Sequence, residues 1–141
     1  MTYYPDLGTK SYIANGAHIR AVGWLSPAHP YARGETTAEF RDRLATFCAS
    51  WAESIDHLDW LPVIGPHLCE FCGQSRAFGN FVIPGKHALY VAPQMIDHYC
   101  AAHDYCPPSE FIEAVMACPD FTAPLYVELV AALEPQGKGE K

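Results

Sequence analysis

The chain has 141 residues, of which 50 % are apolar and 13 % aromatic, and its formal net charge is -7. A chain of this length can bury a core of its own, so the composition excludes an intrinsically disordered protein and a coiled coil. Its 9 Lys and Arg residues are scattered along an acidic chain, which does not fit the basic surface of a nucleic-acid-binding protein. We therefore expect no nucleic acid among its partners.

The N-terminal segment lacks the features of a targeting signal. It has neither a basic start nor a continuous apolar run, and no segment approaches the ~20 apolar residues that a membrane span requires. We therefore predict a cytoplasmic protein without membrane contact. In the cytosol, the 6 cysteines are expected to be free, metal-bound or catalytic rather than paired in disulfides.

The first half of the chain carries the patterns of one strand and one long helix. Apolar residues alternate over 17–25, which predicts a strand. Thr36 stands three residues before Glu39, a spacing typical of a capping box at the start of a helix. Cys48 belongs to the apolar stripe that follows and is interpreted as a small core residue. The stripe predicts a helix over 37–55 and consists of Phe40, Leu44, Phe47, Cys48, Trp51 and Ile55.

The second half begins with an irregular stretch and ends in a run of helices. Pro and Gly residues interrupt 58–79 repeatedly, and this stretch holds a pair of cysteines. Pro84 and Gly85 then stand between two apolar runs and predict a hairpin with a type II turn centred on them. Helical spacing predicts three further helices, over 93–103, 108–118 and 123–134. The order of elements favours an α+β fold with a small antiparallel sheet and four helices.

The residues with the clearest chemistry are two cysteines and two histidines. Cys69 and Cys72 are separated by two residues, so both sulfur atoms can turn toward one metal ion. His98 and His103 follow in a Cys-x2-Cys-x25-His-x4-His pattern, whose ends match a Cys2His2 zinc site. Residues five apart on an ideal helix point about 140° apart. Both imidazoles can therefore reach one ion only if the helix loosens before His103.

Several alternatives to this zinc site remain open from the residues alone. His67 or Cys106 could replace one of the two histidines as a ligand. The cysteines could also be free core thiols, or a redox pair, although the helix start that activates such a pair is not evident. A catalytic zinc would keep three protein ligands and a water, with Glu70, Asp97 or Asp104 as a nearby base. The sequence patterns of zinc deaminases and of His-Glu-x-x-His enzymes are absent.

A set of short segments resembles a known family. These are "GWL" at 23–25, "HLCEFC" at 67–72, "GN" at 79–80, "YVAPQMIDHY" at 90–99, "HDY" at 103–105 and "PPSEFIEAV" at 107–115. Together they are similar to a family of small bacterial proteins of unknown function with a Cys-x-x-Cys and a downstream His pair. The resemblance covers residues 20–118. It implies a one-domain cytoplasmic protein that contains zinc, and it supports treating Cys69, Cys72, His98 and His103 as one set.

The resulting hypothesis is a zinc-binding domain without enzymatic activity. A mainly structural zinc would tie the 58–79 loop to the helix at 93–103 in one domain over 1–134, followed by a disordered tail over 135–141. We expect a protein-interaction or regulatory role with an unidentified protein partner, and no residue is assigned a catalytic role. The alternatives are a zinc-dependent hydrolase-like enzyme with three protein ligands and a water, and a thiol-disulfide redox protein.

A second candidate surface is the loop that contains Trp24, His29 and Tyr31. Aromatic residues on loops are frequent anchors for partners or ligands. The alternative is that Trp24 and Tyr31 cover one edge of the sheet.

Overall fold

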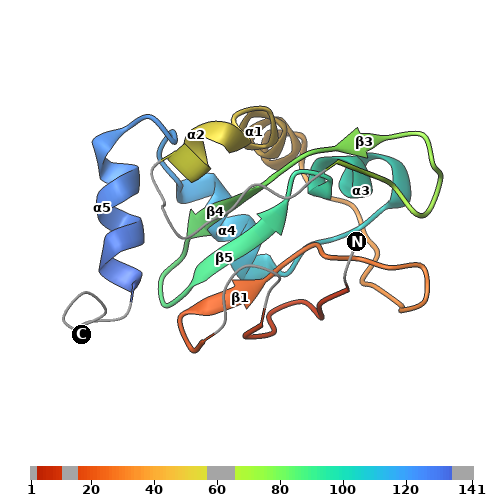
Figure 1. Ribbon diagram of the computed structural model, residues 1–141, viewed down its shortest axis with the longest axis horizontal. Coiled ribbons are helices and arrows are strands. Elements are labelled where there is room, and N and C mark those ends of the chain that lie inside the picture. The colour runs from red at the N-terminus through yellow and green to blue at the C-terminus, as the bar shows by residue number, and fades with distance from the viewer. Residues whose placement is uncertain (1–2, 11–15, 57–65, 135–141) are drawn as a thin grey trace.

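The computed structural model describes residues 3–10, 16–56 and 66–134 (Figure 1). The tail predicted at 135–141 and the part of the irregular loop at 57–65 lie outside the described residues. Helices and strands mix around one small sheet of three strands. Within the described ranges, each helix is too short or too polar to cross a membrane.

The sheet has the strand order β1-β5-β4, where β1 is Ile19–Ala21, β4 is Asn80–Pro84 and β5 is Leu89–Pro93. β4 and β5 form the predicted antiparallel hairpin. β1, however, pairs with β5 in parallel, so the prediction of an antiparallel sheet was wrong. The chain between β1 and β5 includes two helices, and a crossover of this kind is what a parallel pair requires.

The turn of the hairpin lies two residues further along the chain than predicted. Pro84 still pairs with Leu89, and the Gly85 N–H group donates to the Ala88 carbonyl oxygen at 2.8 Å. Lys86 and His87 therefore form the turn, and the type II turn centred on Pro84 and Gly85 was a wrong prediction. Proline is tolerated in β4 because β4 is an edge strand, where a missing N–H group leaves the ladder intact.

Two helices replace the single helix predicted over 37–55. α1 covers Ala38–Ala49 and α2 covers Trp51–Asp56, with a break at Ser50, whose N–H group donates to the carbonyl oxygens of Phe47 and Thr46. The cap of α1 is Thr37, whose side chain accepts from the Phe40 N–H group at 3.1 Å, and not the predicted Thr36. The apolar stripe is nevertheless real, because Phe40, Leu44, Phe47 and Cys48 are all buried.

The other three predicted helices are present as α3 (Ile96–His103), α4 (Ser109–Ala117) and α5 (Pro124–Leu133). The described residues thus form five helices rather than four. A second, two-stranded sheet consists of β2 (His67–Leu68) and β3 (Arg76–Ala77).

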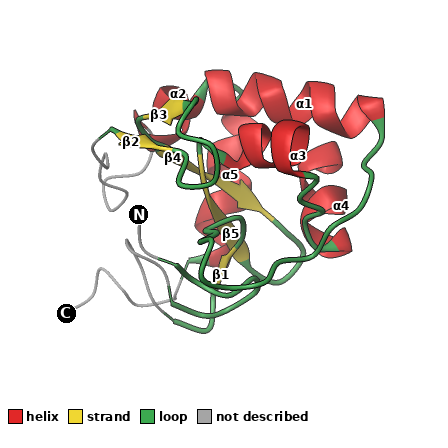
Figure 2. Cartoon of the chain, turned by 90° about the vertical axis from the view of Figure 1, so that its right-hand side faces the viewer, coloured by secondary structure: helices red, strands yellow, loops and turns green. Residues whose placement is uncertain are grey.

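The helices cover the three-stranded sheet unevenly. In Figure 1, α4 lies behind β4 and β5, α1 and α2 lie above β4, and α5 stands at one end of the molecule. The view in Figure 2 shows α1, α3 and α4 gathered on one side of the sheet. The core between these layers is rich in aromatic residues, and its largest fully buried side chains include Trp24, Tyr99, Tyr105, Tyr126, Phe40, Phe47, Phe81 and Phe111.

Candidate metal centre

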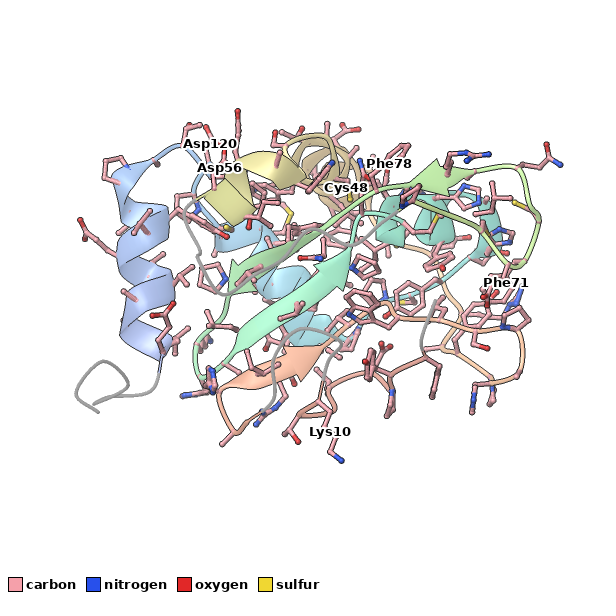
Figure 3. The ribbon with its side chains drawn as sticks, viewed as in Figure 1. Lys10, Cys48, Asp56, Phe71, Phe78 and Asp120 are labelled. Atoms are coloured by element: carbon pink, nitrogen blue, oxygen red, sulfur yellow. The ribbon has the colours of Figure 1, made fainter. Side chains whose placement is uncertain are left out.

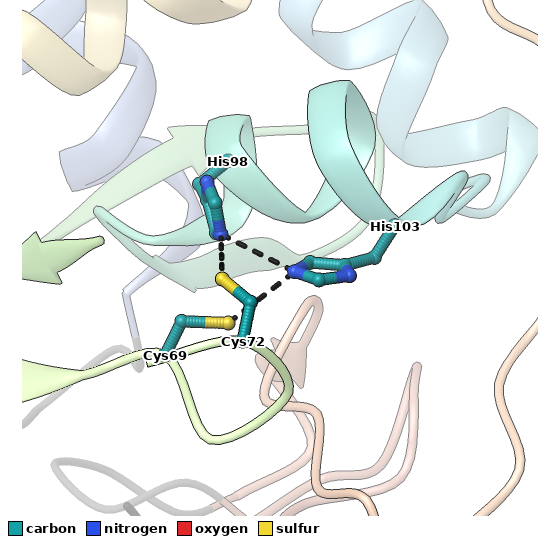
Figure 4. Close-up of side chains that lie close together, drawn as sticks. All are labelled: Cys69, Cys72, His98 and His103. Carbon is teal, nitrogen blue, oxygen red and sulfur yellow. Dashed lines mark hydrogen bonds between the residues drawn. The ribbon is translucent and has the colours of Figure 1, made fainter. Parts of the chain in front are cut away.

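The structure brings the four predicted ligands together. One ligand atom from each of Cys69, Cys72, His98 and His103 lies within 4.8 Å of all the others (Figure 4). The Nε2 atom of His103 is 3.5 Å from the Cys69 sulfur, and the Nε2 atom of His98 is 3.4 Å from the Cys72 sulfur. The two Nε2 atoms are 3.3 Å apart. Two sulfur and two imidazole donors so close together could hold a metal ion.

The cysteines come from a short hairpin, residues 67–77, which we call the knuckle. Its strands β2 and β3 pair His67 with Ala77 and Leu68 with Arg76. Between the strands, the Cys69 N–H group donates to the Ser75 carbonyl oxygen and the Gly73 N–H group donates to the Cys69 carbonyl oxygen, both at 2.8 Å. This tight turn directs both sulfur atoms toward α3.

Gly73 is required by the shape of the turn. Its φ of 66° lies in the left-handed region, which side chains other than Asn and Asp rarely adopt. A Cβ atom at this position would have no heavy atom within 4 Å, so the requirement comes from the backbone and not from crowding. A glycine directly after the second cysteine was a signal in the sequence that the spacing argument did not use.

Backbone N–H groups of the knuckle point at the sulfur atoms. The Gln74 N–H group donates to the Cys72 sulfur at 3.4 Å, and those of Cys72 and Phe71 donate to the Cys69 sulfur. Such bonds stabilise a thiolate and hold it in position for a metal. The backbone of the knuckle could therefore support both sulfur atoms as thiolates.

The histidines come from the two ends of α3. His98 lies in its first turn and His103 is its last helical residue. The following residue, Asp104, has φ 58°, and the N–H groups of Asp104 and Tyr105 both donate to the Tyr99 carbonyl oxygen. The helix was expected to loosen before His103, but the structure places this change directly after it. The Tyr31 hydroxyl group fixes the end of the helix by donating to the His103 carbonyl oxygen at 2.8 Å.

An aromatic side chain of the knuckle packs against α3. The Phe71 ring lies 5.2 Å from the His103 ring, 5.7 Å from the Tyr99 ring and 5.5 Å from the Tyr31 ring, measured between ring centroids. Figure 3 shows Phe71 at the end of the molecule that carries α3. Reasoning from the motif alone missed Phe71 and Tyr31, although Phe71 stands inside the Cys-x-x-Cys segment. Their contacts join the knuckle to α3 next to the ligand cluster.

Burial biases the protonation states of the ligands. It raises the pKa of Cys69, with the backbone N–H groups of Cys72 and Phe71 acting in the opposite direction. Burial also lowers the pKa of His98, and the neighbouring His103 lowers it further. A neutral imidazole is the form that binds a metal, while a buried thiolate needs a nearby positive charge. The shift of His98 thus favours the metal-binding form of its imidazole, whereas the burial of Cys69 opposes its thiolate form.

The residues considered as alternative ligands or as bases lie in different positions relative to the cluster. Cys106 is absent from the cluster, and its sulfur instead lies 3.7 Å from the Pro107 carbonyl oxygen. The backbone of His67 forms β2, while its side chain lies outside the described part of the structure. Glu70 and Asp104, two of the carboxylates considered as bases, are exposed. All six cysteines lie in the described ranges and are free thiols.

An open groove of about 440 Å³ adjoins one side of the cluster. It lies between the end of α1, β3 and α3, and is lined by Cys48, Ser75, Gln94, Asp97 and His98, among others. Asp97 is half-buried there, and its burial raises the pKa of its carboxyl group, while Arg41 and His98 act in the opposite direction. Asp97, the third carboxylate considered as a base, thus lines the same groove as His98 of the cluster.

The aromatic loop has its tryptophan in the core of the protein. Trp24 is 1 % exposed, and its Nε1–H group donates to the Val91 carbonyl oxygen at 2.8 Å. Tyr31 packs against Phe71 and Tyr105 rather than under α1. His29 is exposed and stacks on Tyr3 with ring centroids 3.8 Å apart. Trp24 is therefore a core residue and not a surface anchor, whereas Tyr31 is half-buried and a binding role of the loop stays a prediction.

Comparison with known proteins gives a family without an assigned activity. No curated protein and no solved structure matches the chain. A family model does match, over residues 2–116, which includes the knuckle and all of α3. All four residues of the cluster lie within this match. The chain belongs to the family described as "Domain of unknown function (DUF7919)".

Proposed function

We propose that the chain binds one zinc ion through Cys69, Cys72, His98 and His103, and that the ion is mainly structural. The observation that supports this is the spacing of the four donor atoms. Zinc bonds of about 2.3 Å to sulfur and about 2.0 Å to nitrogen put the corners of a tetrahedron about 3.3 to 3.8 Å apart. The separations of 3.5, 3.4 and 3.3 Å fall in this range.

Such an ion would join the knuckle to α3, in addition to the contacts that the Phe71 ring makes with Tyr99 and His103. Strands β2 and β3 have two residues each, and an isolated hairpin of this size is at best marginally stable. A zinc ion held by the knuckle and by both ends of α3 would fix the hairpin on the core. Structural zinc sites use four protein ligands and leave no position open for a substrate. This is the arrangement that the four donors favour.

The biological role that follows is a protein-interaction or regulatory one. Two large apolar side chains in and directly after the knuckle are exposed, because Leu68 is 47 % exposed and Phe78, just after β3, is 46 % exposed. Apolar side chains on a rigid hairpin are suited to contact with a protein partner. The zinc ion would act indirectly, by holding this surface in one conformation.

The groove beside His98 favours one alternative, a zinc-dependent hydrolase-like enzyme. In that case one of the four donors would leave the ion, a water would take its place, and Asp97 is positioned in the groove to act as the base. The full donor set and the exposed positions of Glu70 and Asp104 support the structural role over this one.

The experiment is elemental analysis of the chain purified without added metal. We expect about one zinc per chain, and loss of the ion in Cys72→Ser because the hydroxyl group does not replace a thiolate ligand. The matched control is Cys106→Ser, which changes a half-buried thiol outside the cluster and should leave the zinc content unchanged. Full zinc content in the double variant Cys69→Ser/Cys72→Ser would contradict the proposal.

A further inference from the structure

A second site opens at the end of the molecule opposite the metal centre. There, a cavity of about 370 Å³ lies between the β4–β5 turn, α4 and α5. Figure 1 shows this turn at the far end of β5 from α3. Its volume falls at the lower end of the range of about 300–1,000 Å³ that is usual for small-molecule sites. An apolar, buried part of its lining is formed by Pro84, Ala88, Tyr90, Ala114 and Cys118.

The charged residues of the cavity stand on two different sides. Arg20 on β1 and Lys86 and His87 on the turn contribute basic groups, whereas Glu110 and Glu113 on α4 contribute carboxylates. Both carboxylates, Lys86 and His87 are exposed, so these groups form the mouth rather than the floor. The cavity thus offers positive charge on its sheet side, negative charge on its helix side and apolar surface between them.

Two of these charges are held in place by the fold. The Tyr90 hydroxyl group donates to the Glu110 carboxylate at 2.7 Å. The Nη1 atom of Arg20 donates to the carbonyl oxygens of Ala17 and Ile19, both at 2.8 Å, which orients the guanidinium group. Burial first, and then Glu110, raise the pKa of Tyr90, while Arg20 opposes this and Glu113 adds to it. Glu110, Arg20 and Glu113 therefore all act electrostatically on the Tyr90 hydroxyl group, and Glu110 contacts it directly.

We propose that this cavity binds a small zwitterion with an apolar side chain, of the class of the apolar α-amino acids. Its carboxylate would face Arg20 and Lys86, its ammonium group would face Glu110 and Glu113, and its side chain would contact the apolar lining. A ligand with one charge would leave the charges of one wall without a counterpart. The volume of about 370 Å³ is sufficient for a ligand of the size of one amino acid. This site is separate from the zinc ion and does not depend on its role.

The ligand chemistry can be tested on the metal-loaded, full-length chain by NMR titration. L-leucine is the zwitterionic probe, N-acetyl-leucine lacks the ammonium group, and leucinamide lacks the carboxylate. We expect leucine to shift the amide resonances around Tyr90 and Ala114, with an affinity at least about tenfold above that of either blocked compound. No shifts at millimolar leucine, or equal affinities for the three compounds, would overturn the proposal.

Two charge-neutral variants locate the site. Arg20→Gln and Glu113→Gln should each weaken leucine binding by about tenfold, since each removes one of the matched charges. The control is Glu128→Gln, which removes an exposed carboxylate of α5 outside the cavity lining. Unchanged zinc content and thermal midpoint show that each variant is folded. Leucine binding that persists unchanged in both site variants would place the ligand elsewhere and overturn the assignment.

Discussion

The Nε2 atoms of His98 and His103 lie 3.3 Å apart, although both residues belong to α3 and stand five positions apart. On an ideal helix their directions would differ by about 140°. The two rings nevertheless meet, with His98 in the first turn of the helix and His103 as its last helical residue, and each Nε2 atom lies within 3.5 Å of a cysteine sulfur of the knuckle. The four candidate donor atoms therefore converge although α3 remains helical up to His103.

Loss of either histidine should weaken metal binding strongly. We expect His98→Ala and His103→Ala to lower zinc affinity by more than about 100-fold, because removal of an outer hydrogen-bond partner already costs about 10–100-fold. Competition with a chromogenic chelator measures this affinity. The control is His87→Ala at the exposed β4–β5 turn, which should have no effect. Equal affinity of the His98→Ala and wild-type chains would remove His98 from the ligand set.

Substitution of Gly73 should test the backbone of the knuckle. Gly73→Ala forces a Cβ into the left-handed region and should cost about 1 kcal/mol, or about fivefold in zinc affinity. Gly73→Asn should cost less, because Asn tolerates this conformation better. The same chelator competition gives both values. If the Ala and Asn variants bind zinc with the same reduced affinity, the cause is not backbone strain.

Removal of the metal should loosen the knuckle and spare the main sheet. The hairpin at 67–77 has few backbone pairs of its own, whereas β4 and β5 are buried along their whole length. Hydrogen exchange after chelation should therefore become faster over 67–77 and remain slow over 80–93. The thermal midpoint should fall without loss of the folded state, since the core persists. Uniform loss of protection along the chain would mean that the whole fold requires the ion.

The cysteines should differ in their reactivity toward an alkylating reagent. Burial raises the pKa of Cys100 and of Cys118 to about 12, so both should stay protonated and unreactive at neutral pH in the folded chain. After metal removal, half-buried Cys72 should react before buried Cys69. Mass spectrometry of the labelled peptides gives the order. Rapid labelling of Cys118 before Cys72 would contradict the described burial.

Two side chains that close the edge of β4 should contribute to stability. Ser54 Oγ accepts from the Val82 N–H group at 3.2 Å, the Tyr126 hydroxyl group donates to the Val82 carbonyl oxygen at 2.7 Å, and the two hydroxyl oxygens are 2.8 Å apart. Ser54→Ala leaves a buried N–H group without its acceptor and should cost about 1–3 kcal/mol in urea unfolding. Tyr126→Phe should be non-additive with it, and full additivity would show that the contacts act independently.

The candidate site was easier to predict than the fold around it. Cys69 and Cys72 lie in one turn, and His98 and His103 lie on one helix. The short spacing within each pair therefore determines most of the arrangement of the donor atoms. The break at Ser50 was missed because the apolar stripe of α1 continues beyond it into Trp51 and Ile55 of α2, which also pack against the core. A periodic pattern shows which face is buried, but it does not show where the backbone hydrogen bonds are interrupted.

The parallel pairing of β1 with β5 also could not be predicted from the sequence. Ile19 pairs with Leu89, 70 residues further along the chain, and a strand's own pattern of apolar residues does not specify the direction of its neighbour. The contacts of Phe71 and Tyr31 beside the cluster were not predicted, for a similar reason. Their role in joining the knuckle to α3 arises from contacts between segments that are distant in sequence.

X-ray absorption at the zinc edge of the purified chain shows whether four protein ligands close the zinc site. The proposed site predicts two sulfur atoms at about 2.3 Å and two nitrogen atoms at about 2.0 Å, with no oxygen ligand. A spectrum that requires three protein ligands and one oxygen would contradict the structural role and favour the hydrolase-like alternative.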